Sequence, residues 1–527
     1  MMSDSAYELA KKDIASALTD TCPASRYEFE WLKRSVAAKY SLPRVPSNPE
    51  VMAMLDRATR ERVRSLLLMK SARSASGVVV SAVMASPYPC PHGSCLYCPG
   101  GPNFGTPQSY TGHEPAAMRA ISSNFDPRTQ VKQRLSQLEQ MGHSTDKVEL
   151  IVMGGTFLSM PHEYQRWFMS ECLNAISDRP TSSLEEAKAC CRASKRRNVA
   201  VTLETRPDYC REQHVDAMLE MGVTRVEIGL QTVFDDVLSS LRRGHTIEDS
   251  VNAIRTAKDA GLKVAVHMMP GLPRSTDERD VEAFKVLFED ERFRPDMLKI
   301  YPTLVMSGTT LNQMFERGEY TPLDDQRAAS IVSKIFMMAP RWVRVMRVQR
   351  DIPANLILAG PRHGNLREHA LELLAAGGKS SLEIRGREIG LSKGSLEEEV
   401  GLVRTFYAAS SGQEAFLEIC GKESDRLFAY LRLRKPSRRT HRPELRNRKC
   451  AIVRELKVLG RATPLGAVWA GSEQHRGLGS FLMSEAEGTA KEEWNADRLF
   501  VTSALGTKEY YARLGYRDEG PYMSKAL

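Results

Sequence analysis

The chain has 527 residues, of which 42% are hydrophobic and 26% are charged, a balance typical of soluble globular proteins of about three domains. The formal net charge is +9, a modest excess that indicates an anionic partner only where basic residues cluster. Ten cysteines are too sparse for a disulfide framework, which excludes a disulfide-rich secreted domain and favours a reducing compartment, the cytoplasm. The apolar run of residues 77–85 is too short to span a bilayer, and residues 1–5 lack the pattern of a signal peptide, so we expect no membrane attachment.

The first 75 residues are basic and have the periodicity of helices. Residues 28–40 carry Trp31, Leu32 and Val36 at helical spacing, and residues 57–73 combine leucines with six Lys or Arg residues. We therefore predict a basic helical segment over residues 1–75. This pattern fits a solvated helical face and an arm that contacts RNA equally well.

A loop at residues 89–101 holds three cysteines, Cys90, Cys95 and Cys98, in the spacing Cys-x4-Cys-x2-Cys. Glycine and proline on both sides favour a backbone that wraps around a ligand. Four thiolates would indicate a closed structural zinc site, whereas three leave one coordination position open. The pattern favours an iron-sulfur cluster with one exposed iron. A zinc knuckle with His92 as the fourth ligand is the alternative.

From residue 76 onward, short β-branched runs alternate with amphipathic helical stretches. Repeated strand–helix units demand a parallel sheet, because each crossover needs a helix to return the chain. The strands are predicted at residues 78–84, 148–153, 199–204, 225–230, 263–268, 297–301 and 343–348. The helices are predicted at residues 163–176, 212–221, 247–260, 278–289 and 324–338. The fold class is therefore α/β, with an open or partial (βα) barrel over residues 76–363.

Residues typical of ligand sites follow directly after these strands, at the edge where the reactive groups of such barrels gather. They are Gly154, Gly155 and Thr156 after one strand, Glu204 and Arg206 at the end of another, Gln231 at a third, and residues 270–273 at a fourth. Glycines in the first turn let the backbone approach a ligand closely. A structural ion pair is the alternative role for Glu204 and Arg206.

The region after the barrel changes in character. Residues 364–395 form the predicted connector, and residues 396–527 form a second domain with strand-like runs at 414–420, 426–433, 451–458 and 499–503. A basic segment, residues 432–449, has nine Lys or Arg residues among eighteen. A glycine-rich turn at residues 474–480 opens a helix that runs to about residue 494. Such a turn points several backbone N–H groups at one spot and suits a pyrophosphate.

The cysteine loop, with Tyr97 directly before the last cysteine, resembles the radical-SAM superfamily, although its first interval is one residue longer than the usual Cys-x3-Cys-x2-Cys. The resemblance implies a 4Fe-4S cluster whose open iron binds the amino and carboxylate groups of S-adenosylmethionine. Gly154, Gly155 and Thr156 resemble the "GGE" element that meets the methionine amino group, with Thr156 in place of the acid. Glu204, Arg206 and Gln231 are then expected to hold S-adenosylmethionine.

The second domain resembles the GNAT acetyltransferases. The strand, the turn of Gln474, Arg476, Gly477, Leu478, Gly479 and Ser480, and the following helix resemble GNAT motif A, which holds the pyrophosphate of acetyl-CoA. Residues 508–516 resemble the "YYxxxGF/Y" ending of this family, in which a tyrosine lies beside the thioester. Ordinary helix-face aromatics are the alternative for Tyr510 and Tyr511.

A radical-SAM barrel followed by a GNAT domain is similar to the catalytic subunits of Elongator, the tRNA wobble-uridine modifying enzymes. Matches occur in order at residues 76–80, 95–101, 108–112, 146–149, 153–157, 204–208 and 520–523. The similarity implies catalytic roles for Tyr510, Tyr511 and Lys147. It also implies acetyl-CoA contacts from Lys147, Glu455, Leu456, Lys457, Val458, Leu478, Gly479, Ser480 and Tyr511. Many members carry a zinc-binding cysteine cluster in the connector, but here those positions are Ser381, Glu383 and Gly386, so we expect no connector zinc.

The function implied by this resemblance is transfer of an acetyl-derived carboxymethyl group to C5 of the wobble uridine of tRNA. A radical derived from S-adenosylmethionine would activate the methyl group of acetyl-CoA, and the two basic segments would contact phosphates of the anticodon loop. A homodimer and accessory subunits are left open. The alternatives are a protein lysine acetyltransferase with the barrel as scaffold, and a non-catalytic tRNA-binding module.

Overall fold

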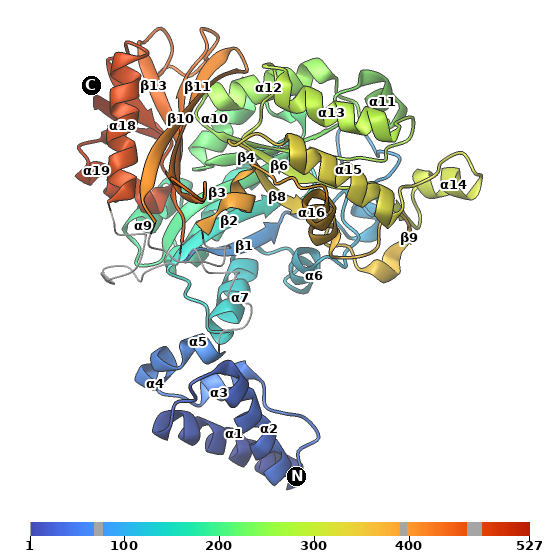
Figure 1. The fold of residues 1–527 in the computed structure, drawn as a ribbon, viewed down its shortest axis with the longest axis vertical. Helices are drawn as coiled ribbons and strands as arrows, with labels where there is room; N and C mark the ends of the chain where they lie inside the picture. Colours follow the sequence, from blue (N-terminus) through green and yellow to red (C-terminus); the bar gives the residue numbers. More distant parts are fainter. Residues whose placement is uncertain (1, 68–76, 390–397, 461–476) are drawn as a thin grey trace.

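The structure, a computed structural model, describes residues 2–67, 77–389, 398–460 and 477–527. It comprises a group of N-terminal helices, a curved parallel sheet covered by helices, and a second sheet with its own helices (Figure 1). None of the helices in these ranges is long and apolar enough to cross a membrane.

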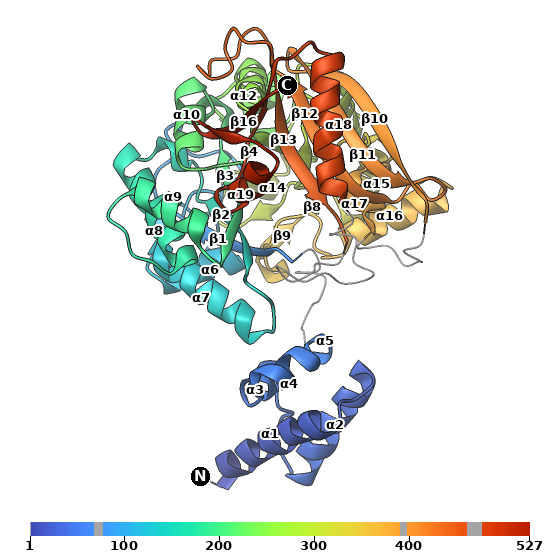
Figure 2. The same cartoon turned by 90° about the vertical axis from the view of Figure 1, so that its left-hand side faces the viewer.

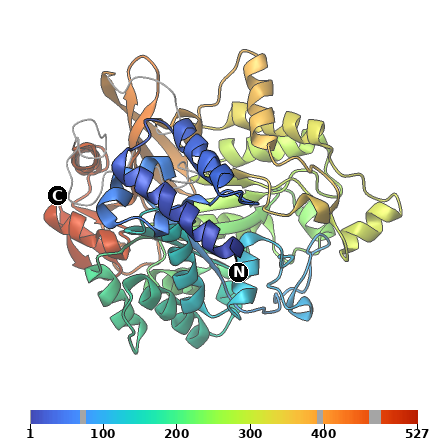
Figure 3. The ribbon, with the colours of Figure 1, turned by 90° about the horizontal axis from the view of Figure 1, so that it is seen from below.

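Five helices make up the N-terminal part: α1 (Met2–Asp20), α2 (Arg26–Lys39), α3 (Asn48–Ala53), α4 (Arg57–Arg62) and α5 (Arg64–Leu67). They bury a small core of their own around Ile14, Leu18 and Phe29. Trp31, predicted on the apolar stripe, instead lies on the solvent face and is 64% exposed. This part projects away from the two sheets (Figure 2), and in the view from below it lies in front of them (Figure 3).

The first sheet confirms the predicted partial barrel. Its seven strands are all parallel and lie in chain order: β1 (Val79–Met84), β2 (Lys147–Met153), β3 (Arg197–Thr205), β4 (Arg225–Gln231), β5 (Lys263–Met268), β6 (Met297–Ile300) and β8 (Arg344–Val348). Each lies within two residues of its predicted bounds. A short antiparallel pair, β7 (Val305–Met306) and β9 (Ile357–Ala359), lies outside this sheet.

Helices cover one face of this sheet and leave the other face as the barrel interior. They are α7 (Pro127–Gln140), α8 (His162–Ser177), α9 (Leu184–Ala193), α10 (Glu212–Glu220), α12 (Ile247–Asp259), α13 (Asp277–Glu289), α15 (Asp325–Met338) and α16 (Leu366–Ala376). Three further helices pack in smaller clusters: α6 (Pro115–Ser122) beside β1, and α11 (Asp235–Ser240) and α14 (Thr310–Glu316) with the cysteine loop. Along β2, Val148, Leu150 and Val152 are buried in the core, and the residues between them are half-buried. Because side chains alternate along a strand, Glu149 belongs to the opposite face, the interior.

The second sheet has the strand order β10-β11-β12-β13-β14-β16-β15. The strands are β10 (Val400–Ala409), β11 (Gly412–Gly421), β12 (Leu427–Lys435), β13 (Cys450–Val458), β14 (Arg498–Val501), β15 (Arg517–Glu519) and β16 (Tyr522–Ala526). The parallel pair β13 and β14 is flanked by antiparallel ones, and α18 (Leu478–Glu492) packs on the sheet with α19 (Lys508–Arg513) beside it (Figure 2). The predicted strands and helix are confirmed, whereas β10, β15 and β16 were not predicted.

The predicted connector, residues 364–395, packs against both sheets. Leu366, Ala370 and Leu374 of α16 belong to the barrel core, and Ile384 of α17 (Ile384–Arg387) belongs to the core of the second sheet. The Glu383 carboxylate accepts hydrogen bonds from the backbone N–H groups of residues 345 and 385. It also forms an ion pair with Arg367 of α16. Residues 390–397 lie outside the described ranges.

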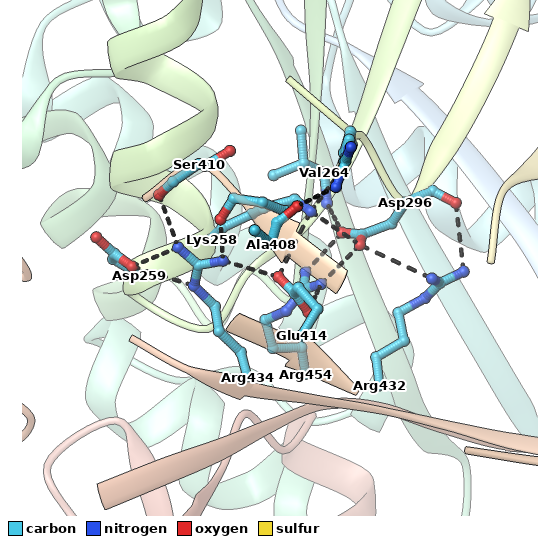
Figure 4. A network of polar contacts seen from close by, with 12 residues as sticks. Lys258, Asp259, Val264, Asp296, Ala408, Ser410, Glu414, Arg432, Arg434 and Arg454 are labelled. Atoms are coloured by element: carbon cyan, nitrogen blue, oxygen red, sulfur yellow. Dashed lines mark hydrogen bonds and ion pairs between the residues drawn. The ribbon is translucent and has the colours of Figure 1, made fainter. Parts of the chain in front are cut away.

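A buried network of charges joins the barrel to the second sheet (Figure 4). Arg454 of β13 donates to both carboxylate oxygens of Asp296, each at 2.6 Å, and to Glu414 at 2.6 Å. Arg434 of β12 donates to Asp259 at 2.6 Å and to Glu414 at 2.8 Å. Arg432 and Lys258 complete the network.

This network corrects one expectation. Arg432 and Arg434 begin the basic segment 432–449 that was expected to contact tRNA phosphates, and that expectation is wrong for both. Their side chains are fully buried because carboxylates of the barrel, distant in the sequence, pair with them. The exposed cations of the segment begin with Lys435.

Candidate active site

The cysteine loop lies across the mouth of the barrel and is held there by both backbone and side chains. The Leu96 N–H donates to the Leu241 carbonyl at 3.2 Å, and the Leu96 carbonyl accepts from the Leu311 N–H at 2.9 Å. Leu96 packs in a separate apolar cluster with Leu272 and Val305, which follow β5 and β6. The loop is therefore fixed over the carboxyl ends of the strands.

The three predicted metal ligands are brought together with polar groups from the neighbouring strand ends. Cys90 Sγ lies 3.6 Å from the Thr156 hydroxyl, and Cys98 Sγ lies 3.2 Å from the Ser109 hydroxyl. Cys95 Sγ lies 3.2 Å from His92 Nε2 and accepts from Arg243 at 3.6 Å. Burial raises the pKa of Cys90 and of Cys98, so the thiols need a cation or metal to favour their thiolates.

A cavity of about 160 Å³ lies between this loop and the strand ends. The predicted residues that line it are Cys90, Tyr97, Gly155, Thr156, Glu204, Arg206 and Gln231. Gly154 lies beside it with φ of 134°, where a methyl group would lie 3.2 Å from the backbone nitrogen of Ala85. Gln231 has φ of 75°, a conformation that is costly for a residue with a side chain and is often found at functional sites. The sequence therefore predicted one wall of a real cavity.

Glu204 and Arg206 make structural contacts, the alternative role considered for them, and both also line the cavity. The Tyr110 hydroxyl donates to Glu204 at 2.7 Å, and Arg206 forms a bidentate pair with Asp208 at 2.9 and 3.0 Å. Arg206 is 2% exposed, yet within the described residues its Nη1 has no hydrogen-bond partner. A buried, unpartnered guanidinium nitrogen beside a cavity fits an anionic or hydroxyl group of a ligand.

Sequence reasoning missed eight polar residues that also line the cavity. They are Glu227, Arg243, His267, Lys299, Tyr301, Arg347, Arg350 and Asp351. Glu227, His267 and Lys299 lie on β4, β5 and β6, whose other residues are mostly apolar. A single charged residue within a buried strand was the available signal, because such a group needs a partner or a ligand.

A second pocket, of about 370 Å³, lies beside the end of β13 and the start of α18. β13 pairs with β14 over Cys450 to Val453, and the pocket begins further along β13, at Leu456. Gly477 caps α18 with φ of 76°, which glycine adopts without strain. Backbone N–H groups at this helix start point toward the pocket end of the helix, an arrangement that suits a phosphate group.

The predicted acetyl-CoA residues fall in three groups. Those that line the second pocket are Leu456, Val458, Gly477, Gly479, Ser480, Tyr510 and Tyr511. Those that do not line it are Lys147, Glu455, Lys457 and Leu478. Gln474 and Arg476 lie outside the described residues. Burial raises the pKa of Tyr510 and of Tyr511, so both hydroxyls stay protonated and can donate hydrogen bonds.

The two cavities lie at opposite ends of the barrel. Thr507 lines the second pocket, and a methyl group on its neighbour Gly506 would lie 2.7 Å from the Asn198 carbonyl, at the amino end of β3. The first cavity lies at the carboxyl ends of the same strands. Between them the interior holds buried ion pairs, Arg225 with Glu149 and Lys299 with Glu227.

Comparisons with known proteins identify the family to which this chain belongs. Residues 87–287 match the Radical SAM superfamily, and residues 295–374 match the Radical_SAM C-terminal domain. The tRNA uridine(34) acetyltransferase of Methanocaldococcus infernus is 45% identical over 491 residues, which cover 92% of each chain. Elongator complex protein 3 of Drosophila melanogaster is 43% identical over 507 residues, covering 94% of this chain and 92% of that one. The chain belongs to the family of the tRNA uridine(34) acetyltransferases and Elongator complex protein 3.

A solved structure of a family member matches the fold over most of its length. The archaeal Methanocaldococcus infernus Elp3 with an N-terminal deletion superposes with a TM-score of 0.76 at 41% identity, covering 86% of this chain and 99% of that one. Membership of the radical SAM superfamily implies a 4Fe-4S cluster and S-adenosylmethionine. The three grouped thiols and the adjoining cavity with its unpartnered Arg206 nitrogen fit both. The zinc-knuckle alternative is therefore set aside.

Proposed function

We propose that this protein modifies C5 of the wobble uridine of tRNA, using acetyl-CoA and a radical derived from S-adenosylmethionine. The observation that carries the proposal is the presence in one chain of a thiol-rimmed barrel cavity and a second pocket at a glycine-capped helix start. Related proteins that match 92% and 94% of this chain are named tRNA uridine(34) acetyltransferase and Elongator complex protein 3.

The barrel cavity is the proposed site of the radical step. Cys90, Cys95 and Cys98 would hold the cluster, and Arg206 with Gln231 would bind polar groups of S-adenosylmethionine. When bound, these two groups supply a carbon radical able to remove a hydrogen atom from the methyl group of acetyl-CoA. The chain's own part is to orient the partners and to exclude water, which the buried loop over the barrel mouth supports.

The second pocket is the proposed acetyl-CoA site. The turn at Gly477–Ser480 would bind the pyrophosphate, and Tyr510 and Tyr511 would lie along the pantetheine arm. Glu455 accepts from Arg432 of the neighbouring strand β12 at 2.9 Å, and Arg432 in turn pairs with Asp296 of the barrel. Lys147, half-buried at the amino end of β2, lies on the barrel side of this region, and burial lowers its pKa.

The tRNA surface is proposed to combine the N-terminal helices with the exposed part of the segment 432–449. Tyr27 and Trp31 on the basic α2 are 82% and 64% exposed, and exposed aromatic side chains on a basic surface suit unpaired bases. Arg438, Arg439 and Arg446 are exposed in the second segment. The wobble base is unpaired in the anticodon loop, so it can enter a deep cavity at small cost.

A reducing compartment, the cytoplasm, is proposed for the protein. All ten cysteines are unpaired, seven of them outside the cysteine loop. Oxygen-sensitive clusters and free thiols both persist where disulfides are not formed. A homodimer and accessory subunits remain proposals that follow from the Elongator resemblance.

Mass spectrometry of tRNA nucleosides tests the function. After anaerobic incubation with reductant, S-adenosylmethionine and acetyl-CoA, the protein is expected to form a carboxymethylated uridine. The Cys98→Ala variant is expected to form none, and the exposed-cysteine variant Cys22→Ala to match the unaltered protein. Acetylated lysine in a protein substrate, formed equally by Cys98→Ala, would favour a lysine acetyltransferase instead. Acetyl-CoA left unconsumed in the presence of tRNA would favour a binding module.

A further inference from the structure

We propose that Lys299 and His267, on the neighbouring strands β6 and β5, bind the Watson–Crick edge of the target uracil and distinguish it from cytosine. The inference rests on the proposed function and specifies which wall of the barrel cavity receives the base. Both side chains line the cavity, and they are register partners on adjacent strands. Lys299 Nζ lies 3.8 Å from Glu204, so the base would lie beside the predicted S-adenosylmethionine residue at the end of β3.

The two side chains are held together by one buried carboxylate. Glu227 of β4 is fully buried and lies beneath them. Lys299 Nζ forms an ion pair with Glu227 Oε2, and His267 Nε2 lies 3.1 Å from the same oxygen. Although burial opposes ionisation, the charge of Lys299 and the hydrogen bond from His267 hold the pKa of Glu227 below its usual value. Glu227 is therefore a carboxylate.

An ionised carboxylate fixes the tautomer of His267. Since a carboxylate only accepts hydrogen bonds, Nε2 of His267 must carry the proton that it donates to Glu227. In the neutral ring Nδ1 is then an acceptor. Tyr301 packs edge-on against the imidazole, with ring centroids 5.3 Å apart, and limits its rotation. Lys299 keeps further N–H groups besides the one that faces Glu227.

The wall therefore presents a donor next to an acceptor, which matches uracil. On its Watson–Crick edge uracil has the O4 acceptor and the N3–H donor side by side, so Lys299 would bind O4 and His267 Nδ1 would accept from N3–H. Cytosine has the opposite order, an amino donor and an N3 acceptor. Its amino group would then face the Lys299 donor, and its N3 would face the His267 acceptor. C5 lies on the ring next to C4 and outside this edge, so it stays free to react.

Two other roles for these residues fit the geometry less well. Glu204, Glu227 and His267 bring ligand atoms within 4.8 Å of one another, a spacing that could hold a metal ion. The Lys299 ammonium, however, pairs with Glu227 and lies 3.8 Å from Glu204, so a protein cation already occupies the position beside both carboxylates. A role in binding S-adenosylmethionine is better suited to Arg206, whose buried guanidinium nitrogen without a partner among the described residues lies at the end of a different strand.

Binding of anticodon stem-loops tests the inference. Two fluorescent RNAs that differ only in U or C at the wobble position are titrated into anaerobic holoenzyme. The unaltered protein is expected to bind the U form at least about tenfold more tightly, the usual discrimination of a paired donor and acceptor. His267→Phe is expected to lose this preference and to keep its affinity for the C form within about twofold, since only the base-reading contact of a bidentate pair is removed.

A second variant guards against loss of folding. Lys299→Met alone would leave Glu227 buried and unpaired, so it is combined with Glu227→Gln to remove both charges. This double variant should also lose the preference and retain S-adenosylmethionine binding in equilibrium dialysis. Lys285→Met, an exposed lysine on α13, is the matched control and should keep the preference.

The outcomes separate this inference from the function beneath it. If both cavity variants keep the preference for uridine, or lose S-adenosylmethionine binding, the assignment of this wall to the base is wrong while uridine modification can stand. If the unaltered protein neither prefers the U form nor modifies uridine in tRNA, the proposed function itself fails.

Discussion

Two buried clusters of charge in this molecule differ in one respect that separates structure from function. At the interface of the two sheets, Arg454, Arg434 and their neighbours pair with every carboxylate oxygen of Asp296, Glu414 and Asp259 (Figure 4). In the barrel, by contrast, Arg206, Glu227 and Lys299 line a cavity of about 160 Å³, so these charges adjoin open space. The closed cluster holds two domains in register, and the open one is available to ligands.

The largest effect is expected from breaking the closed cluster. Arg454→Met removes the cation shared by Asp296 and Glu414 and leaves both carboxylates buried without it. A loss of about 3–5 kcal/mol in unfolding free energy is expected, the usual cost of an uncompensated buried charge. Anaerobic urea unfolding measures it. Arg317→Met, which breaks an exposed pair with Glu319, is the control and should leave the unfolding free energy nearly unchanged. Equal losses in the two variants would contradict the comparison.

Asp280, a buried carboxylate outside both clusters, shows what happens when neutral groups take the place of the cations. Asp280 accepts from the Gly271 N–H and the Ser275 hydroxyl, each at 2.6 Å, and burial raises its pKa from 3.8 to about 6. Because this pKa lies above that of an unfolded aspartate, the stabilising contribution is complete below about pH 4 and is lost as the pH rises through about 6.

Asp280→Asn should remove this pH dependence. Roughly two pKa units correspond to a change of up to about 3 kcal/mol in unfolding free energy. The stability of the variant relative to the unaltered protein should therefore increase from pH 4.5 to pH 7.5, as measured by thermal unfolding at each pH. Glu282→Gln, at an exposed position of the same helix α13, should follow the unaltered protein. A constant difference across this range would show that Asp280 has an ordinary pKa.

A change in the open cluster should affect binding more than stability. Arg206→Met is expected to weaken S-adenosylmethionine binding by roughly tenfold to a hundredfold, the worth of about 1.5–3 kcal/mol for hydrogen bonds to a charged group. Equilibrium dialysis of the reconstituted protein measures it. Asp208→Asn, which alters only the partner of Arg206, should have a smaller effect. A thermal midpoint lowered as much as in Arg454→Met, with unchanged affinity for S-adenosylmethionine, would instead show that Arg206 stabilises the fold and does not bind the ligand.

The smallest effect on stability is expected where the basic segment is exposed. Arg438, Arg439 and Arg446 lie on the surface, whereas Arg432 and Arg434 of the same segment are buried. Replacing the three exposed arginines with glutamine should weaken tRNA binding and reduce the slope of log affinity against log salt by about 3, one for each lost phosphate contact. Unfolding free energy should change by less than about 0.5 kcal/mol per site. An unchanged salt slope would remove this surface from the tRNA site.

The parts of the fold that sequence predicted are those set by local patterns. The seven barrel strands and the cysteine loop were found because period-two and 3.6-residue patterns and a cysteine spacing are complete within about ten residues each. β10 was missed because much of it is exposed and lacks a clear alternation of apolar residues.

The missed and misread residues depend on contacts between distant segments. His267 and Lys299 lie in strands that are mostly apolar, and they are brought together as register partners of β5 and β6, a pairing that neither strand's sequence shows alone. Arg432 and Arg434 have the local pattern of a solvated basic run, because their partners Asp259 and Asp296 lie far earlier in the chain. A run of basic residues, considered without its partners, predicts exposed side chains. That prediction is correct here only from Lys435 onward.

The central claim is that the open cluster in the barrel brings a radical to the methyl group of acetyl-CoA. Incubation of the reduced protein and tRNA with S-adenosylmethionine and methyl-deuterated acetyl-CoA tests it directly. The account predicts that mass spectrometry will find 5′-deoxyadenosine carrying one deuterium, together with a deuterated side chain on uridine. Unlabelled 5′-deoxyadenosine formed beside a labelled acetyl group on an amine would contradict it.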